Sequence, residues 1–237
     1  MSLTILIPIK NEEKGILDTL KYFKESWVIN IDHEIILIDD FSTDNTYEEI
    51  KKFQSSELNY KIIKNKRKGL GSAMIVGIEN SSKEFIGIFM ADLSDSLEDL
   101  KRYYNSIKEN KLNAVFGSRF IKGSIVTNYP MTKYYMNRVA NNIIKIIFFS
   151  NYNDYTNAFK IYERKTLLEL FPLVSENFNI FLELPLKIIS RKYNYKIIPI
   201  SWKGRVTGIS KFNIKELGSK YIFTLLYCLL EKILLKK

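Results

Sequence analysis

Cysteine and histidine are almost absent from this 237-residue chain, which contains one of each. A disulfide framework is therefore excluded, and a zinc site, which needs several Cys or His ligands, is not expected. The lone Cys228 lies in an apolar segment, where we expect a small buried hydrophobic residue. A signal-peptide pattern is also missing, because Pro8 interrupts the first apolar run and Lys10 follows it. We therefore expect a cytoplasmic protein, either free or peripheral on the cytoplasmic face of the membrane.

The chain also lacks an apolar run long enough to cross a membrane. The best candidate, Tyr221 to Leu230, has about half of the roughly 20 apolar residues that a spanning helix needs, and Lys220, Glu231 and Lys232 border it. Large apolar side chains between lysines are typical of a helix that lies in a membrane interface. They are equally typical of a packing helix or an oligomer contact. The sequence leaves these alternatives and the oligomeric state open.

Basic residues outnumber acidic ones: the chain has 36 Lys and Arg against 26 Asp and Glu, and its formal net charge is +10. Such a charge favours polyanionic partners, which are nucleic acid, anionic lipid headgroups or phosphorylated substrates. Binding of nucleic acid would require basic and aromatic residues interleaved on a recognition surface, and no such motif is present. We therefore expect an anionic membrane surface or a phosphorylated substrate, and no nucleic acid.

Short apolar runs alternate with amphipathic segments through about residue 118. Strands are predicted over 3–9, 34–39, 60–64, a run ending at residue 92, and 114–117, with helices between them ending near residues 27, 53, 80 and 108. Further on, helices are predicted over 131–150, 182–193 and 213–235, and a strand over 196–202. This order predicts an α/β fold with a mostly parallel sheet. We expect one domain over residues 1–212 and a C-terminal amphipathic helix over residues 213–237.

The apolar run over residues 85–91 stops at two carboxylates, Asp92 and Asp95. In open α/β sheets, ligands bind beyond the carboxyl ends of the strands. One or two carboxylates in that position hold a hard divalent cation that bridges diphosphate oxygens. Asp95 is equally suited to cap the helix expected to begin at Leu97. The sequence therefore predicts a cation site at Asp92, with Asp95 as a second ligand or as a helix cap.

Polar residues or glycines follow three more of the predicted strands. Asp39 and Asp40 follow the second strand, and ionised carboxylates there suit ribose hydroxyls or the donors of a base edge. Gly69 and Gly71 follow the basic residue Arg67 and precede a helix, so the backbone there could approach a phosphate. A dinucleotide-binding Rossmann site would place its glycines after the first strand instead. Together, these strand ends predict a nucleotide-diphosphate pocket.

These segments resemble the successive motifs of family 2 glycosyltransferases. The resemblance covers about residues 3 to 212 and rests on Ile7-Pro8-Ile9-Lys10-Asn11-Glu12, Ile38-Asp39-Asp40-Phe41-Ser42-Thr43-Asp44, Gly69-Leu70-Gly71-Ser72-Ala73, Ala91-Asp92, Gly117-Ser118-Arg119, the segment 154–160, Phe181-Leu182-Glu183 and the segment 202–211. The later motifs are similar to those of the branch that contains dolichyl-phosphate mannosyltransferases and bacterial polyprenyl-phosphate sugar transferases.

The resemblance implies a GT-A-type, Rossmann-like nucleotide-binding fold, an inverting transfer from a GDP- or UDP-linked sugar, and Mg²⁺ or Mn²⁺ as cofactor. The acceptor it implies is a polyprenyl phosphate or a membrane glycolipid. The residues it implies for nucleotide-sugar binding are Pro8, Asn11, Glu12, Asp39, Asp40, Arg67, Gly69, Gly71, Ala91 and Asp92. Those it implies for the acceptor or the transferred sugar are Arg119, Asp154 and Glu183.

The chain departs from the family pattern at two places. The metal motif commonly reads Asp-x-Asp, and Met90 stands at its first position. Asp92 is then expected to carry most of the cation binding, with Asp95 as its helper. The acceptor motif commonly has Ser-Gly before its Phe, where this chain has Asn157-Ala158. The identity of the acceptor is therefore less constrained by the resemblance than the class of donor.

The implied mechanism depends on charge at the departing diphosphate. Breaking the bond to the anomeric carbon leaves negative charge on the nucleotide diphosphate, which cationic groups must meet. A cation at Asp92 and the basic pair Arg205 and Lys211 would do this. Gly204 and Gly208 would allow the loop that carries this pair to fold over the site. The same pair is also compatible with a solvated basic loop.

The role expected for Asp154 depends on the acceptor. A sugar hydroxyl needs a general base, for which Asp154 is the candidate. A phosphate monoester needs none, because its second pKa of about 6 leaves it largely ionised at neutral pH, and Asp154 would then orient the acceptor or hold the sugar. Glu183 would contact sugar hydroxyls or order the Asp154 loop. The motif pattern favours polyprenyl phosphate, with a saccharide hydroxyl in surface-polysaccharide synthesis as the alternative.

Overall fold

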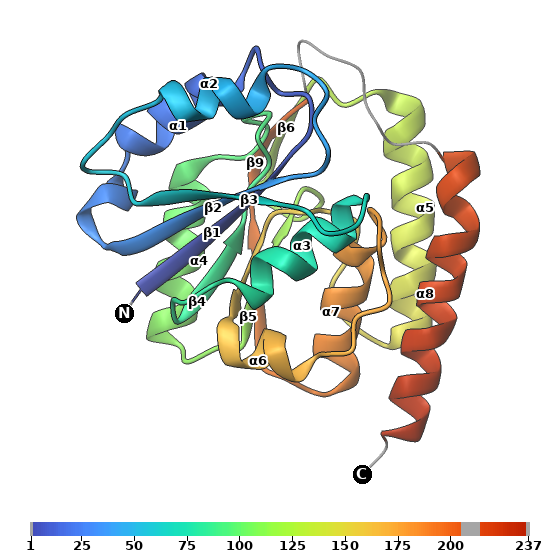
Figure 1. Ribbon diagram of the computed structural model, residues 1–237. Helices are drawn as coiled ribbons and strands as arrows, with labels where there is room; N and C mark the ends of the chain where they lie inside the picture. Colours follow the sequence, from blue (N-terminus) through green and yellow to red (C-terminus); the bar gives the residue numbers. More distant parts are fainter. Residues whose placement is uncertain (1, 205–213, 236–237) are drawn as a thin grey trace.

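The computed structural model describes residues 2–204 and 214–235 of the chain (Figure 1). In these residues the central sheet has seven strands in the order β3-β2-β1-β4-β7-β5-β8. Their bounds are β1 Ser2–Ile9, β2 Asp32–Asp39, β3 Tyr60–Lys64, β4 Phe85–Ile88, β5 Ala114–Ser118, β7 Lys160–Glu163 and β8 Tyr195–Pro199. Only β7 runs antiparallel to its neighbours, β4 and β5. The expected α/β fold with a mostly parallel sheet is confirmed.

Successive side chains of the central strands enter two different cores, as alternation along a doubly covered strand requires. On β1, Ile5 and Ile7 join the core on one face of the sheet, whereas Leu6 joins the core on the other. On β2, Leu37 and Ile38 divide in the same way. Both strands are buried along almost their whole length, which explains their continuous apolar sequences.

Helices cover both faces of the sheet. The bounds are α1 Ile16–Lys24, α2 Thr46–Lys52, α3 Leu70–Glu79, α4 Leu97–Glu109, α5 Met131–Phe148, α6 Arg164–Glu169, α7 Ile180–Ser190 and α8 Ile214–Leu234, with a 3₁₀ turn η1 at Trp27–Asn30. Helices α1, α2 and α4 contribute to the first core, and α3, α5, α6, α7 and α8 contribute to the second. This three-layer arrangement brings the loops after β1, β2 and β4 to one edge of the sheet.

The predicted bounds of two strands were wrong. The predicted strand over 196–202 is split at Ile200, which separates β8 from β9 (Ser201–Lys203). The Ile200 amide still donates to Ser118 at the end of β5, but its carbonyl accepts from Ile125 of β6 (Ile125–Thr127), so the chain passes there from the central sheet to a second, two-stranded sheet. The strand predicted to end at Asp92 ends at Ile88 instead.

The C-terminal helix α8 packs one face against the domain. Cys228 is fully buried in the second core, as expected, and Glu231 forms ion pairs with Lys187 and Arg191 of α7. At its far end, Lys232 donates to the carbonyl of Phe148 in α5, and Figure 1 shows α5 and α8 side by side. Among the described residues, no helix is long and apolar enough to span a bilayer.

Candidate active site

The loops after β1 and β2 are tied together at the carboxyl edge of the sheet. The amide of Asn11 donates to Ser42 Oγ (3.0 Å), and Asn11 Oδ1 accepts from the Thr43 amide (2.8 Å). Asp39 Oδ1 accepts from the Ser42 amide (3.2 Å), and the Glu12 amide donates to Thr46 Oγ1 (2.8 Å). Pro8 precedes this loop on β1, paired with Ile38 of β2. The structure therefore brings Asn11, Glu12 and Asp39, three of the ten residues expected for the nucleotide sugar, to one edge of the sheet.

Three adjacent strand ends each carry a non-glycine residue with positive φ. These residues are Asn11 after β1 (50°), Phe41 after β2 (59°) and Leu93 after β4 (53°). Phe41 and Leu93 are exposed, so burial of their side chains does not compensate for the strain. Such conformations cost on the order of 1–3 kcal/mol each and concentrate at binding and catalytic sites. Four other described residues share this conformation elsewhere, but only this edge has three of them at adjacent strand ends, so it is the candidate ligand site.

Asp40 is committed to contacts within the protein. Its carboxylate accepts from Asn65 Nδ2 (2.8 Å) and the Gly69 amide (2.7 Å) on one oxygen and from Lys10 Nζ (3.3 Å) on the other. Asn65, directly after β3, was not predicted as a site residue. It also donates to the Gly69 carbonyl and accepts from Ser72 Oγ. Asp40 and Asn65 thus fix the loops after β1, β2 and β3 relative to one another.

Gly69 and Gly71 are required by a contact with another loop. A Cβ atom on Gly69 would lie 2.2 Å from the carbonyl oxygen of Glu176, and one on Gly71 would lie 2.1 Å from that of Ser175. The Gly71 amide donates to the Glu176 carbonyl (3.0 Å), and Arg67 forms an exposed ion pair with the Glu176 carboxylate (2.5 Å). This contact alone accounts for both glycines, and the expected approach of this backbone to a phosphate stays a prediction.

Asp92 and Asp95 lie together in the loop between β4 and α4. Asp92 Oδ1 accepts from the Ser94 amide (3.1 Å), and Thr19 of α1 holds the carbonyl of Ala91 (2.8 Å). The helix cap is Ser96, whose Oγ accepts from the Glu98 amide. The alternative role of Asp95 as the cap of α4 is thus wrong.

Asp95 is buried, and its Oδ1 has no hydrogen-bond partner in the described part of the chain. Burial, and then the charge of Asp92, raise the pKa of Asp95 to about 8. These features fit a divalent cation. It would reduce the repulsion between the two carboxylates and would bind the Asp95 oxygen that lacks a hydrogen bond. No group of three or more His, Cys, Asp or Glu side chains suited to a metal occurs among the described residues, so substrate oxygens would complete the coordination.

A cleft of about 240 Å³ adjoins this loop. It is lined by Tyr22, residues 93–96, Ile125, Thr127 and residues 201–203. The amide of Lys203 donates to the Ser94 carbonyl (3.0 Å), and Asp95 pairs with Trp202 in a single antiparallel bridge. Strand β9 is therefore fastened to the carboxylate loop directly before the segment that contains Arg205 and Lys211. Those two residues lie outside the described part of the chain.

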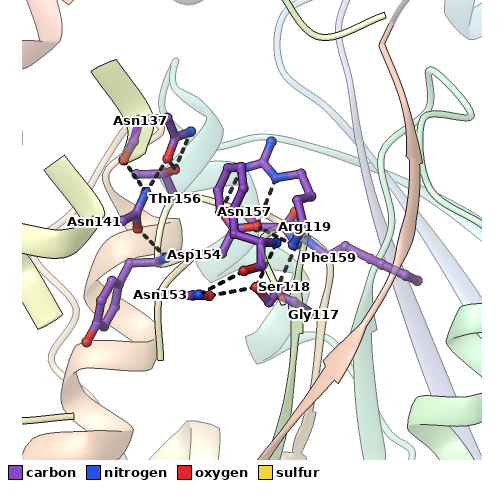
Figure 2. Close-up of polar contacts among 12 residues, drawn as sticks. Gly117, Ser118, Arg119, Asn137, Asn141, Asn153, Asp154, Thr156, Asn157 and Phe159 are labelled. Carbon is purple, nitrogen blue, oxygen red and sulfur yellow. Dashed lines mark hydrogen bonds and ion pairs between the residues drawn. The ribbon is translucent and has the colours of Figure 1, made fainter. Parts of the chain in front are cut away.

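Asp154 and Arg119 form a buried ion pair at the end of β5 (Figure 2). Arg119 Nε and Nη2 donate to Asp154 Oδ2 (2.9 Å) and Oδ1 (2.7 Å), and the Arg119 amide donates to Oδ2 as well (2.9 Å). The Asp154 side chain is fully buried, and 8% of the Arg119 side chain is exposed. Burial lowers the pKa of Arg119, but the charge of Asp154 outweighs this and raises it overall. Both oxygens of Asp154 accept hydrogen bonds from Arg119, so this carboxylate holds the Arg119 side chain in position.

The turn that carries Asp154 is held by amide side chains, as Figure 2 shows. Asn141 of α5, fully buried, accepts from the Tyr155 amide (2.6 Å), and Asn137 of the same helix donates to Thr156 Oγ1 (3.2 Å). Asn157 Nδ2 donates to the Gly117 carbonyl (3.3 Å). Asn137 and Asn141 were not predicted as site residues. The residue that replaces the family's usual Ser thus ties the turn to β5.

The hydrogen bonds of Glu183 are with a different loop. Its carboxylate accepts from the amides of Val174 (3.0 Å) and Ser175 (2.8 Å) and pairs with Lys187 (3.4 Å), and it is fully buried. It therefore orders the loop that packs on Gly71. Neither expectation for Glu183, a sugar contact or a contact with the Asp154 loop, is supported by these partners.

Comparison with known proteins agrees with this geometry. The model of glycosyl transferase family 2 matches residues 4–171. A dolichol-phosphate mannosyltransferase from Pyrococcus furiosus is 28% identical over 221 residues, which are 92% of this chain and 61% of that protein. A polyprenol monophosphomannose synthase from Mycolicibacterium smegmatis is 24% identical over 193 residues, which are 77% of this chain and 72% of that protein. The chain thus spans about three fifths of the length of the first of these relatives.

A solved structure with the same fold is that of glucosyl-3-phosphoglycerate synthase from Mycobacterium tuberculosis, in complex with Mn²⁺, uridine diphosphate and phosphoglyceric acid. It has a TM-score of 0.71 and is 14% identical, over 96% of this chain and 78% of that one. At this identity the likeness concerns the fold, which is the GT-A fold of glycosyltransferases. With the family model covering more than two thirds of its length, the chain belongs to glycosyl transferase family 2.

Proposed function

We propose that this chain transfers one sugar from a GDP- or UDP-linked donor to the phosphate of a polyprenyl phosphate at a membrane surface, with inversion at the anomeric carbon. The observation that supports this acceptor is the state of Asp154. A general base must reach the acceptor hydroxyl, whereas the Asp154 side chain is fully buried and both its oxygens accept hydrogen bonds from Arg119. A phosphate monoester, with a second pKa of about 6, is already ionised at neutral pH and needs no base. The two named relatives, a dolichol-phosphate mannosyltransferase and a polyprenol monophosphomannose synthase, favour the same acceptor.

The donor nucleotide is assigned to the edge formed by the loops after β1 and β2. Asn11, Glu12 and Asp39 lie there, and carboxylate oxygens suit ribose hydroxyls or the donors of a base. Pro8 and Ala91 shape the backbone on either side of this edge. Asp40 takes part by holding the loops in register, since its own oxygens are used within the protein.

The diphosphate is assigned to the loop of Asp92 and Asp95, the residues that would hold Mg²⁺ or Mn²⁺. When bound, the cation would neutralise charge on the departing diphosphate. Asp92 would supply a carboxylate in the loop after β4, and Asp95 would supply its buried oxygen that lacks a hydrogen-bond partner. Arg205 and Lys211, which follow β9 in the chain, are proposed to meet the same diphosphate.

The transfer itself exchanges one bond for another. An oxygen of the acceptor phosphate forms a bond to the anomeric carbon while the bond from that carbon to the diphosphate breaks. The electron pair of the broken bond leaves with the nucleotide diphosphate, and no proton has to move. We assign Arg119 to orient the acceptor phosphate, and the position of its guanidinium at the end of β5, held by Asp154, supports this role.

The membrane surface is assigned to the outer faces of α5 and α8. Each helix exposes a row of large apolar side chains, which are Met131, Tyr135, Met136, Val139, Ile143 and Ile146 on α5 and Ile222, Phe223, Leu226, Leu230, Ile233 and Leu234 on α8. Monomeric proteins seldom expose contiguous apolar patches of this kind unless the patch is functional. The net charge of +10 favours an anionic surface as the partner.

The test is a donor screen with a lipid acceptor. Purified protein is incubated with vesicles containing a polyprenyl phosphate, Mn²⁺, and radioactive GDP-mannose or UDP-glucose, and the organic phase is counted. We expect label in the organic phase with one donor, and none with Asp92→Ala protein. Transfer to a saccharide hydroxyl with no lipid-linked product would overturn the proposed acceptor and favour polysaccharide synthesis.

A further inference from the structure

Lys160 is a fully buried lysine that the proposed mechanism has not used. It is the first residue of β7, paired with Ile88 of β4 and Phe116 of β5, and its side chain is inaccessible to solvent. Lysine is almost never fully buried unless it is paired. Among the described residues, however, Lys160 has no carboxylate within ion-pair distance, in contrast to the other fully buried lysine, Lys187, which pairs with Glu183. A buried ammonium without a counter-ion calls for a functional explanation.

The Lys160 ammonium is directed at the turn that carries Asp154. Its Nζ donates to the carbonyls of Tyr155 (3.1 Å) and Asn157, and to the carbonyl of Phe181 at the start of α7 (3.4 Å). An ammonium has three N–H donors, so these three carbonyls use all of them. Lys160 thereby ties Tyr155 and Asn157 of the Asp154 turn to Phe181, which belongs to the second core.

Charge gives Lys160 a second role at the same place. Asp154 and Arg119 neutralise one another, so their pair presents no net charge to an incoming anion. The charged groups that act on Lys160 are Asp154 and Arg119 on the β5 side and Asp95 on the β4 side. On α7, the carboxylate of Glu183 is taken up by Lys187 and by two backbone amides. Lys160 is therefore the fully buried cation beside this neutral pair, whereas Arg138 of α5, which packs on Phe120 and donates to the Asn153 carbonyl, is partly exposed.

We propose that Lys160 is a positioning residue for an anionic acceptor: its ammonium holds the Asp154 turn and supplies the positive charge that lets a phosphate bind beside Arg119. This inference rests on the proposed phosphate acceptor. In the free protein, burial lowers the pKa of Lys160 to about 7, against the charge of Asp154, which raises it. A bound phosphate raises that pKa, so acceptor binding takes up a proton, by about half a proton at pH 7.

The test compares three variants by calorimetry in buffers of different ionisation enthalpy, with geranyl phosphate as acceptor and GDP or UDP present. Lys160→Met keeps the length of the side chain but loses charge and donors. It should raise the dissociation constant of geranyl phosphate roughly 10- to 100-fold, leave nucleotide affinity within about twofold of the parent, and abolish the proton uptake. Lys160→Arg keeps a permanent charge. It should recover much of the affinity without any proton uptake.

Lys187→Met is the matched control, because it removes another fully buried ammonium from the same core. It should lower Tm but leave the dissociation constant of geranyl phosphate and the proton uptake unchanged. An equal dissociation constant and equal proton uptake in Lys160→Met and the parent would overturn the inference, and so would an identical defect in Lys187→Met. Should Lys160→Met fail to fold by circular dichroism, Lys160→Arg carries the test through its lost proton uptake. If the parent binds GDP or UDP but not geranyl phosphate, the proposed acceptor fails, and the inference fails with it.

Discussion

Replacing Asp154 with Asn distinguishes a positioning carboxylate from a general base. Asp154 is fully buried and accepts from Nε, Nη2 and the amide of Arg119. Asparagine keeps one acceptor oxygen but turns an NH₂ group toward the guanidinium, so the buried charge of Arg119 loses its counter-ion. Breaking a buried ion pair by removing one partner costs about 3–5 kcal/mol, and the retained hydrogen bond favours the lower figure. For a chain of this size, a loss of about 3 kcal/mol lowers Tm by roughly 6–12 °C.

The assay measures thermal unfolding by circular dichroism and turnover with polyprenyl phosphate on the same preparation. The Asp154→Asn protein should melt earlier yet keep measurable turnover, and the acidic limb of its rate profile should still follow the acceptor phosphate near pH 6. Adding Arg119→Met should restore part of the lost Tm, because it removes the unpaired charge. An unchanged Tm together with a loss of turnover of about 10²–10⁴-fold would refute this reasoning, since that combination marks the loss of a general base.

Three further changes test other parts of the site. Asp92→Ala should abolish turnover and Asp95→Ala should cost less, whereas equal activity of Asp92→Ala and the parent across a Mn²⁺ titration would refute the cation assignment. Gly71→Ala should lower the free energy of unfolding by about 1–3 kcal/mol, because its Cβ would lie 2.1 Å from a backbone carbonyl oxygen, and Gly15→Ala, with nothing within 4 Å, is the control. Val139→Glu on the exposed face of α5 should weaken co-sedimentation with anionic vesicles while Val139→Leu does not, and equal binding of both would argue against this face.

Elements with a strong local pattern were predictable from the sequence. The third strand was predicted over 60–64 and is found there, and the helix predicted over 131–150 is α5, Met131–Phe148. Strand β7 was not predicted, because Lys-Ile-Tyr-Glu is short and has no apolar period. It is a strand because β4 and β5 offer it hydrogen bonds on both sides. The break at Ile200 likewise depends on its partners in two sheets, which no local pattern reveals.

The residues of the candidate site differ in the same way: some are marked by a local sequence pattern, and others depend on partners far away in the sequence. Asp39 could be placed at the end of its strand because it directly follows an apolar run, whereas Asp92 follows such a run but lies four residues beyond the end of β4. The roles of Asn65 and Asn141 could not be predicted, since each depends on a backbone group or a carboxylate from another part of the chain. The contact that requires the two glycines could not be predicted for a related reason. The backbone of Gly71 approaches the carbonyl of Glu176, which is more than a hundred residues away in the sequence.

The position of β7 bears on how two anions meet in the proposed reaction. The diphosphate is assigned to Asp92 beyond β4, and the acceptor phosphate to Arg119 beyond β5, with the antiparallel β7 between these strands. Neighbouring strands lie about 4.8 Å apart, so β7 separates the two ends by about 10 Å. Two carboxylates mark the first end, where a cation is needed before a diphosphate can bind. The Arg119–Asp154 ion pair and Lys160, the first residue of β7, lie at the second end, where the proposed phosphate acceptor needs no metal. Each anion then has its own counter-charge, and the sugar can pass between two phosphates that would otherwise repel one another.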